Sequence, residues 1–91
     1  MKKVDLKVTS EVGLHAKPAD LFVRAANRFN CDIRVSNLTT GSAEVNGKSI
    51  LHILALGVYN GHVIRVSAHG EDEQAALESL SQLVYSNFPP P

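Results

Sequence analysis

The sequence of 91 residues predicts an α+β fold, an open-faced sandwich in which three helices pack on one face of a four-stranded antiparallel sheet. Two patterns support this prediction. Short segments of alternating apolar and polar residues are typical of strands with one buried face. Segments with apolar residues at helical spacing are typical of helices that cover a sheet. These elements follow in the order βαββαβα without a linker or repeat, so we expect residues 1–88 to form a single domain.

The first strand and the first helix have clear patterns. Apolar and polar residues alternate over residues 4–8, which predicts a strand. A helix is expected to begin near Lys17 and to run toward Phe29, with its apolar residues on one side. Pro18 suits the first turn of this helix, because the missing N–H of proline is no loss there.

The middle of the chain predicts two more strands, a short helix and a fourth strand. Alternation returns over residues 32–36, and residues 37–41 indicate a hairpin turn into a third strand that ends near Val45. A short apolar helix is expected within residues 49–57. Residues 64–68 then alternate as a fourth strand.

The last helix has the clearest pattern. It follows an acidic first turn at residues 71–73, where negative charge suits the positive end of the helix dipole. The apolar residues at helical spacing are Ala76, Leu77, Leu80, Leu83, Val84 and Phe88. The prolines at residues 89–91 cannot continue a helix, and we expect them to form a frayed tail.

The composition argues against several classes of protein. Nine basic and nine acidic residues balance, and the isoelectric point is near 6.9, so we expect no nucleic-acid partner and no membrane insertion. The single Cys31 has no partner within the chain and is expected to be a reduced core or edge residue. Together these features predict a cytoplasmic protein.

Three further histidines do not indicate a metal site. They lie far apart and lack the close His/Cys pairing of a zinc site: His52, His62 and His69. Packing or solvent-facing roles suit them better. We therefore expect no metal and no cofactor.

The segment GLHAKPA, residues 13–19, is the strongest candidate for a functional site. It places His15 at the N-terminus of the first helix. Backbone N–H groups near Ala16 and Lys17, the positive end of the helix dipole and the Lys17 ammonium would all stabilise an anion carried by His15. The pattern therefore predicts a phosphate-bearing histidine.

This segment resembles the active-site motif of the HPr family, the histidine-containing phosphocarriers of the bacterial phosphoenolpyruvate-dependent phosphotransferase system. A second signature, VNGKSIL at residues 45–51, lies where that family carries a regulatory serine and a partner-binding helix. The resemblance covers essentially the whole chain. It implies the strand order 1-4-2-3 and a phosphoryl carrier that is a stoichiometric intermediate and not an enzyme.

The resemblance also implies roles for individual residues. His15 would accept a phosphoryl group on Nδ1 from phosphorylated enzyme I and pass it to the A domain of an enzyme II for sugar uptake. Lys17 would neutralise phosphate charge, and the backbone of Ala16 and Lys17 would bind it. The family usually has arginine at the position of Lys17 and often a small polar residue at that of Val12. Lysine supplies only a point charge, without the guanidinium fork.

The short helix is apolar nearly all round, so two of its faces need covering. Ile50, Leu51 and Leu54 share one arc, and Ile53 and Leu56 lie on another that can face the sheet. On the residues alone, burial in the core and docking of a partner are equally good explanations. The resemblance favours docking, since it implies one partner surface formed by this helix and the region of His15: Ala16, Asp20, Ile50, Leu51 and Leu54.

Ser49 has two interpretations. A plain N-cap of the short helix explains it completely. Phosphorylation by an HPr kinase/phosphorylase is implied only by the resemblance, as are transcriptional regulators among the partners.

Two other functions of the whole chain stay open. One is a nitrogen-regulatory HPr that relays phosphate to regulatory acceptors. The other is a protein of the same fold that acts by docking alone. We expect a monomer in each case.

Overall fold

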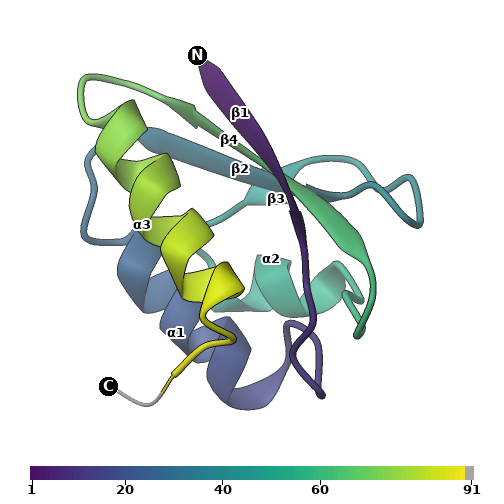
Figure 1. Ribbon diagram of the computed structural model, residues 1–91. Coiled ribbons are helices and arrows are strands. Elements are labelled where there is room, and N and C mark those ends of the chain that lie inside the picture. The colour runs from purple at the N-terminus through teal and green to yellow at the C-terminus, as the bar shows by residue number, and fades with distance from the viewer. Residues whose placement is uncertain (90–91) are drawn as a thin grey trace.

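The four strands found within residues 1–89 form one antiparallel sheet in the order β1-β4-β2-β3, which confirms the predicted fold (Figure 1). The computed structural model describes these 89 of the 91 residues. Val66 occupies the centre of the sheet, because it lies opposite Val4 on one side and Val35 on the other. The strands are β1 (Lys2–Lys7), β2 (Asp32–Asn37), β3 (Val45–Asn46) and β4 (Val63–His69).

All three helices of the described chain cover the same face of this sheet: α1 (Ala16–Ala26), α2 (Ile50–Ala55) and α3 (Glu73–Tyr85) (Figure 1). The core lies between the helices and the sheet. Its largest fully buried side chains include Leu6, Leu14, Phe22, Ile33, Ile53, Ile64 and Leu80. Cys31 is buried among these residues, and burial raises the pKa of its thiol.

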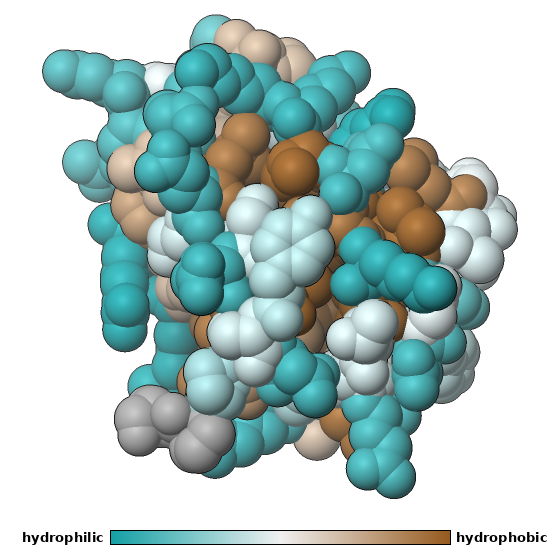
Figure 2. Space-filling model, viewed as in Figure 1, coloured by the Kyte–Doolittle hydropathy of each residue, from teal (hydrophilic) through white to brown (hydrophobic). Residues whose placement is uncertain are grey.

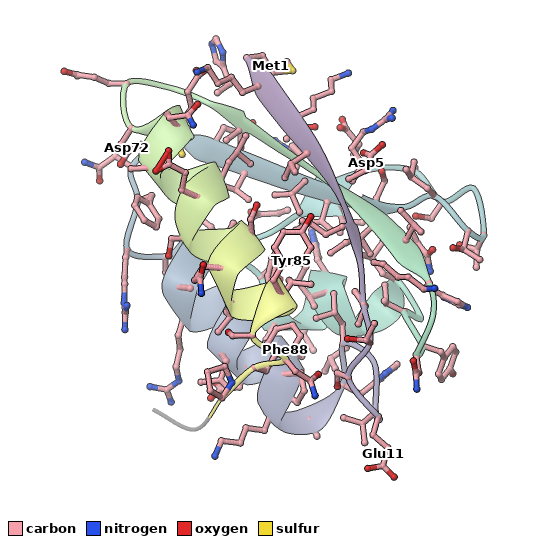
Figure 3. The ribbon with its side chains drawn as sticks, viewed as in Figure 1. Met1, Asp5, Glu11, Asp72, Tyr85 and Phe88 are labelled. Atoms are coloured by element: carbon pink, nitrogen blue, oxygen red, sulfur yellow. The ribbon has the colours of Figure 1, made fainter. Side chains whose placement is uncertain are left out.

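The opposite face of the sheet is polar. Arg65 on β4 donates to the carboxylate of Asp5 on β1, with Nε 2.8 Å from Oδ1 (Figure 3). This hydrogen bond lowers the pKa of Asp5. The pair is solvent-exposed, so it keeps the face polar and adds little stability.

The loop before β2 is fixed to the start of α3 by one carboxylate. Asp72 accepts hydrogen bonds from the backbone N–H groups of Asn30, at 2.8 Å, and Cys31, at 2.9 Å. These donors lower the pKa of Asp72, the Asn30 amide having the largest effect. The carboxylate therefore fixes where β2 begins relative to α3 (Figure 3).

The first helix is shorter than predicted and ends at Ala26, before Phe29. Asn27 stops it, because its side-chain amide donates to the Val23 carbonyl at 2.8 Å and to the Lys48 carbonyl at 3.0 Å. Phe29 lies in the turn that follows and still packs, partly buried, against the core. The apolar spacing was thus a reliable sign of packing but not of helix length.

The last helix also ends early, at Tyr85 and not at Phe88. The Ser86 hydroxyl donates to the Gln82 carbonyl at 2.7 Å, and Asn87 and Phe88 have left-handed backbone angles, with φ of 59° and 52°. The chain therefore reverses, and Phe88 reaches the core from a turn (Figure 3). Of the predicted proline tail, Pro89 is exposed, and residues 90–91 lie outside the described residues.

The connection between β2 and β3 is longer than the predicted turn at residues 37–41 and runs through residues 38–44. Asn37 organises it. Its carbonyl accepts from the N–H groups of Gly41 and Ser42, and its side-chain oxygen accepts from that of Thr39 at 3.1 Å. Because Asn37 is fully buried, this loop is anchored to the core at one end.

A groove between β1 and α3 exposes apolar side chains between polar ones (Figure 2). Val4 and Leu77 line it, and Tyr85 lies at the end of α3, where it is 68% exposed (Figure 3). None of the helices within residues 1–89 is both long enough and apolar enough to cross a membrane.

Candidate functional site

His15 is the residue that begins α1, and its own backbone is extended, with φ of −128° and ψ of 163°. Its side chain accepts no hydrogen bond from the amides of the first helical turn. Those N–H groups have no partner inside the helix and are free to bind an acceptor oxygen. The structure thus has amides without a side-chain partner at the start of α1, directly after His15, and their binding of phosphate stays a prediction.

The backbone is strained directly after the histidine. Ala16 has φ of 52°, in the left-handed region that residues with a Cβ adopt at a cost of about 1 to 3 kcal/mol. Strain of this kind is kept only where the surroundings fix it, and it is concentrated at functional sites. It turns the chain sharply between His15 and Lys17.

The loop before His15 is fastened to the loop that follows α2. The Leu14 N–H donates to the Val58 carbonyl at 3.0 Å, and the Gly61 N–H donates to the Val8 carbonyl at 2.7 Å. Gly13 permits this close approach: a Cβ there would lie 2.1 Å from the Val58 oxygen, and its φ is 67°. Only glycine fits both the angle and the space.

The imidazole of His15 has one identifiable hydrogen bond. Its Nδ1 lies 3.1 Å from the Val12 carbonyl oxygen. A carbonyl oxygen only accepts, so Nδ1 is assigned as the protonated nitrogen, and in the neutral ring Nε2 carries the lone pair. In this orientation Nδ1 is engaged with the protein.

Tyr59 is the residue at this site that the sequence reasoning missed. Its ring stacks on that of His15, with centroids 5.1 Å apart and an interplanar angle of 29°. It also forms a T-shaped contact with the ring of His62, with centroids 5.7 Å apart and an interplanar angle of 90°. The turn signal at residues 60–61 placed Tyr59 in a loop, but no local pattern relates it to a histidine far away in the chain.

The charged residues of α1 have separate surroundings. Lys17 is exposed beside His15. Asp20 pairs with Arg24 one helical turn further on, at 2.9 Å, and both side chains are solvent-exposed. Lys17 is thus the cation closest to His15 in the sequence, while the charge of Asp20 is balanced by Arg24.

The structure confirms that α2 has two apolar faces. Ile53 is fully buried and Leu56 nearly so, whereas Leu51 is 74% exposed. Ile50 and Leu54, at 39% and 38%, lie on the exposed arc with it. Since α2 contacts α1 and the loop after it carries Tyr59, this exposed arc belongs to the same region of the molecule as His15 (Figure 1).

Ser49 is the N-cap of α2, as its sequence position predicts. Its Oγ accepts a hydrogen bond from the His52 N–H at 3.3 Å. The His52 ring accepts in turn from the Asn46 N–H through Nδ1, at 3.2 Å. Within residues 1–89, no cluster of three or more His, Cys, Asp or Glu side chains is arranged to hold a metal ion.

This fold is that of a known family of phosphoryl carriers. The family described as "PTS HPr component phosphorylation site" matches residues 2–86. The chain belongs to this HPr family. Its members are phosphocarriers of the phosphotransferase system and not catalysts in the usual sense.

Individual relatives are similar over nearly the whole chain. The phosphocarrier protein HPr of Xylella fastidiosa is 38% identical over 88 residues, which are 97% of this chain and 96% of that protein. The HPr-like protein Crh of Bacillus subtilis is 42% identical over 84 residues, 92% of this chain and 95% of that protein. A crystal structure of HPr from Thermoanaerobacter tengcongensis has a TM-score of 0.92 and 42% identity, covering 97% and 96% of the two chains.

Other relatives differ in length or assembly. The multiphosphoryl transfer protein of Salmonella typhimurium is 39% identical over 77 residues, and these are only 20% of its length. Similar structures include an HPr dimer from Thermoanaerobacter tengcongensis and a Crh dimer with a swapped domain. Dimers thus occur among the solved relatives, and a monomer stays a prediction for this chain.

The two faces of α2 predict effects of very different size on stability for truncation to alanine. Leu51→Ala should change the free energy of unfolding by no more than about 0.5 kcal/mol, because the side chain is exposed. Ile53→Ala on the same helix should cost about 2 to 5 kcal/mol, since it leaves a cavity in the core. Urea unfolding measures both. A loss of similar size in the two variants would contradict the assignment of Leu51 to the exposed face.

Proposed function

We propose that this chain accepts a phosphoryl group on His15 from phosphorylated enzyme I and passes it to the A domain of an enzyme II, in support of sugar uptake. The observation that carries the proposal is the position of His15 at the start of α1, beside unpartnered amides and the exposed Lys17. Amide donors and a positive helix end stabilise a phosphoryl group there. Membership of the HPr family supports the same chemistry.

The transfer requires the His15 ring to change its hydrogen bonding. For Nδ1 to accept the phosphoryl group, as the family implies, it must leave the Val12 carbonyl, 3.1 Å away, and lose its proton to solvent while Nε2 takes one up, which gives Nδ1 an in-plane lone pair. The Nδ1 lone pair forms the new N–P bond while the bond from phosphorus to the donor breaks. The proton of the neutral ring is then held on Nε2.

Lys17 balances negative charge of the phosphoryl group on His15. Lys17 is exposed and has no fork geometry, so it acts on the phosphoryl group as a mobile point charge. The backbone of Ala16 and Lys17 supplies directional hydrogen bonds. This division of roles leaves orientation to the amides and charge to the ammonium.

The exposed apolar arc of α2 is the proposed docking surface for both partners. Leu51 at its centre is flanked by Ile50 and Leu54, and the proposed surface includes Ala16 and Asp20 of α1, which are both exposed. A partner that covers this arc brings its phosphorylated group to the region of His15. An apolar centre with polar edges is typical of protein interfaces.

Docking without phosphoryl transfer is the second candidate function. The exposed arc of α2 supports it independently of His15, and one similar protein is named only "HPr-like". A nitrogen-regulatory branch would use the same site with other acceptors. We place the protein in the cytoplasm as a monomer, and an HPr kinase/phosphorylase and transcriptional regulators are further proposed partners.

Phosphorylation of His15 is tested by intact mass. Incubation with phosphoenolpyruvate and enzyme I should add one phosphoryl group to the wild-type protein, and acid should remove it because an N–P bond is acid-labile. His15→Ala should gain no mass. His69→Ala, which removes an exposed histidine elsewhere, should react like the wild type.

Other results of this experiment would distinguish phosphoryl transfer on His15 from the alternatives. A wild-type protein that stays unmodified but still binds enzyme I would leave docking as the function. Mass gain in His15→Ala would place the phosphoryl group on another residue.

Ser49 is proposed as the regulatory residue. Negative charge suits the N-terminus of a helix, so Ser49→Asp should keep the melting temperature within about 4 °C of the wild type. The same charge borders the exposed arc of α2, so phosphorylation of His15 by enzyme I should slow. Ser81→Asp adds equal charge on α3 and should leave the rate unchanged. Equal rates in both variants would reduce Ser49 to a helix cap.

A further inference from the structure

We propose that Tyr59 is a positioning residue for His15, one whose stacked ring keeps the imidazole in a single plane while Nδ1 moves from Val12 to the phosphoryl group. This inference rests on the proposed function and names the residue that makes the histidine ready for transfer. Tyr59 does not itself touch the reacting phosphorus.

The exposure of Tyr59 is the first reason. Its residue is 61% exposed, so the ring is not held by the core. It nevertheless lies against His15, with centroids 5.1 Å apart and 29° between the planes. Of its two aromatic contacts, the stack on His15 is the closer one, since the His62 ring centroid lies 5.7 Å away.

The second reason is that His62 fixes the backbone of Tyr59. His62 Nδ1 accepts from the Tyr59 backbone N–H at 3.2 Å and from the Asn37 side-chain amide at 3.1 Å. His62 also meets the Tyr59 ring edge-on. Since Asn37 is fully buried, this chain of contacts connects the exposed tyrosine to the end of β2.

The loop before His15 fixes the other side of the stack. An added Cβ at Gly13 would lie 2.7 Å from the Tyr59 Cα, so the two loops are in direct contact. The Leu14 hydrogen bond to Val58 lies beside this contact. The two loops that carry these rings are therefore joined by direct backbone contacts.

The geometry of imidazole explains what a fixed plane achieves. The lone pair of Nδ1 lies in the ring plane, so a tyrosine over one face does not obstruct an approach along the edge. A half-turn about the Cβ–Cγ bond returns the ring to the same plane. The stack thus favours two orientations of His15, one with Nδ1 on the Val12 carbonyl and one with Nδ1 released, and disfavours the tilted orientations between them.

The test compares three tyrosine variants in single-turnover phosphorylation by enzyme I. Tyr59→Leu keeps bulk but not stacking and should lower the maximal rate about two- to tenfold, the range that an aromatic pair corresponds to. Tyr59→Phe keeps the ring and should stay within about twofold of the wild type. Tyr85→Leu, which removes an equally exposed tyrosine from α3, should not change the rate.

Two further readouts separate positioning from docking and from folding. In Tyr59→Leu, the enzyme I concentration for half-maximal rate should be unchanged, because a docking contact would raise it. Proton NMR of the His15 ring should lose the ring-current shift in Tyr59→Leu and keep it in Tyr59→Phe. Melting temperatures should stay within about 4 °C, since the side chain is exposed.

His62 provides an internal check through a double-mutant cycle. His62→Ala should slow transfer in the wild-type background, because it frees the Tyr59 loop. It should have no further effect once Tyr59 is leucine.

The outcomes are distinguishable. A maximal rate in Tyr59→Leu equal to that of the wild type, or an effect confined to half-saturation, overturns the role of Tyr59 and leaves the phosphocarrier proposal standing. A wild-type protein that accepts no phosphoryl group overturns the proposed function and this inference together.

Discussion

The close approach of Gly13 to the Val58 carbonyl is the contact on which the rest of the site depends. It allows the Leu14 amide to donate to Val58, and so it joins the loop before α1 to the loop after α2. These loops lie far apart in the sequence and side by side in space (Figure 1). Without that join, His15 would begin a helix but would have no tyrosine against its ring and no apolar helix in a fixed place nearby.

The site combines groups with different degrees of freedom. The amides at the start of α1 belong to a helix, and the Tyr59 backbone N–H is bound to His62 Nδ1, whereas Lys17 and the arc around Leu51 are exposed. A carrier that meets several partners has reason to keep its reacting group preorganised and its contact surface adaptable. The strained Ala16 belongs to the fixed part, because its φ of 52° is imposed directly beside His15.

Local patterns predicted the elements well and their ends less well. Alternation located the strands, and Pro18 located the start of α1. The ends of α1 and α3 were missed because single side chains set them: the amide of Asn27 and the hydroxyl of Ser86 bind the last carbonyls. Phe88 had helical spacing by coincidence, since a reversing turn brings it to the core. The strand order came from the family resemblance. Local patterns could not predict it, because it depends on pairing between strands that are far apart in the sequence.

The site residues also divide into those that local sequence patterns predict and those that depend on contacts between distant segments. His15, Lys17 and the two faces of α2 follow from short-range spacing, which is why they could be named from the sequence. Tyr59 and His62 could not be named, because stacking and the shared acceptor at His62 Nδ1 depend on how two loops meet. Gly13 is part of the motif in the sequence, but the need for glycine there is explained only by the neighbouring Val58 carbonyl.

Comparison of Gly13→Ala with Gly41→Ala tests this account most directly. Both glycines have positive φ, 67° and 74°, but an added Cβ collides with Val58 only at Gly13 and meets open space at Gly41. Urea unfolding should show a loss of about 1 to 2 kcal/mol for Gly41→Ala and about 1 to 3 kcal/mol more for Gly13→Ala. The ring-current shift of His15 should disappear only in Gly13→Ala. Equal losses in the two variants, with the His15 signal unchanged, would contradict the claim that this contact organises the site.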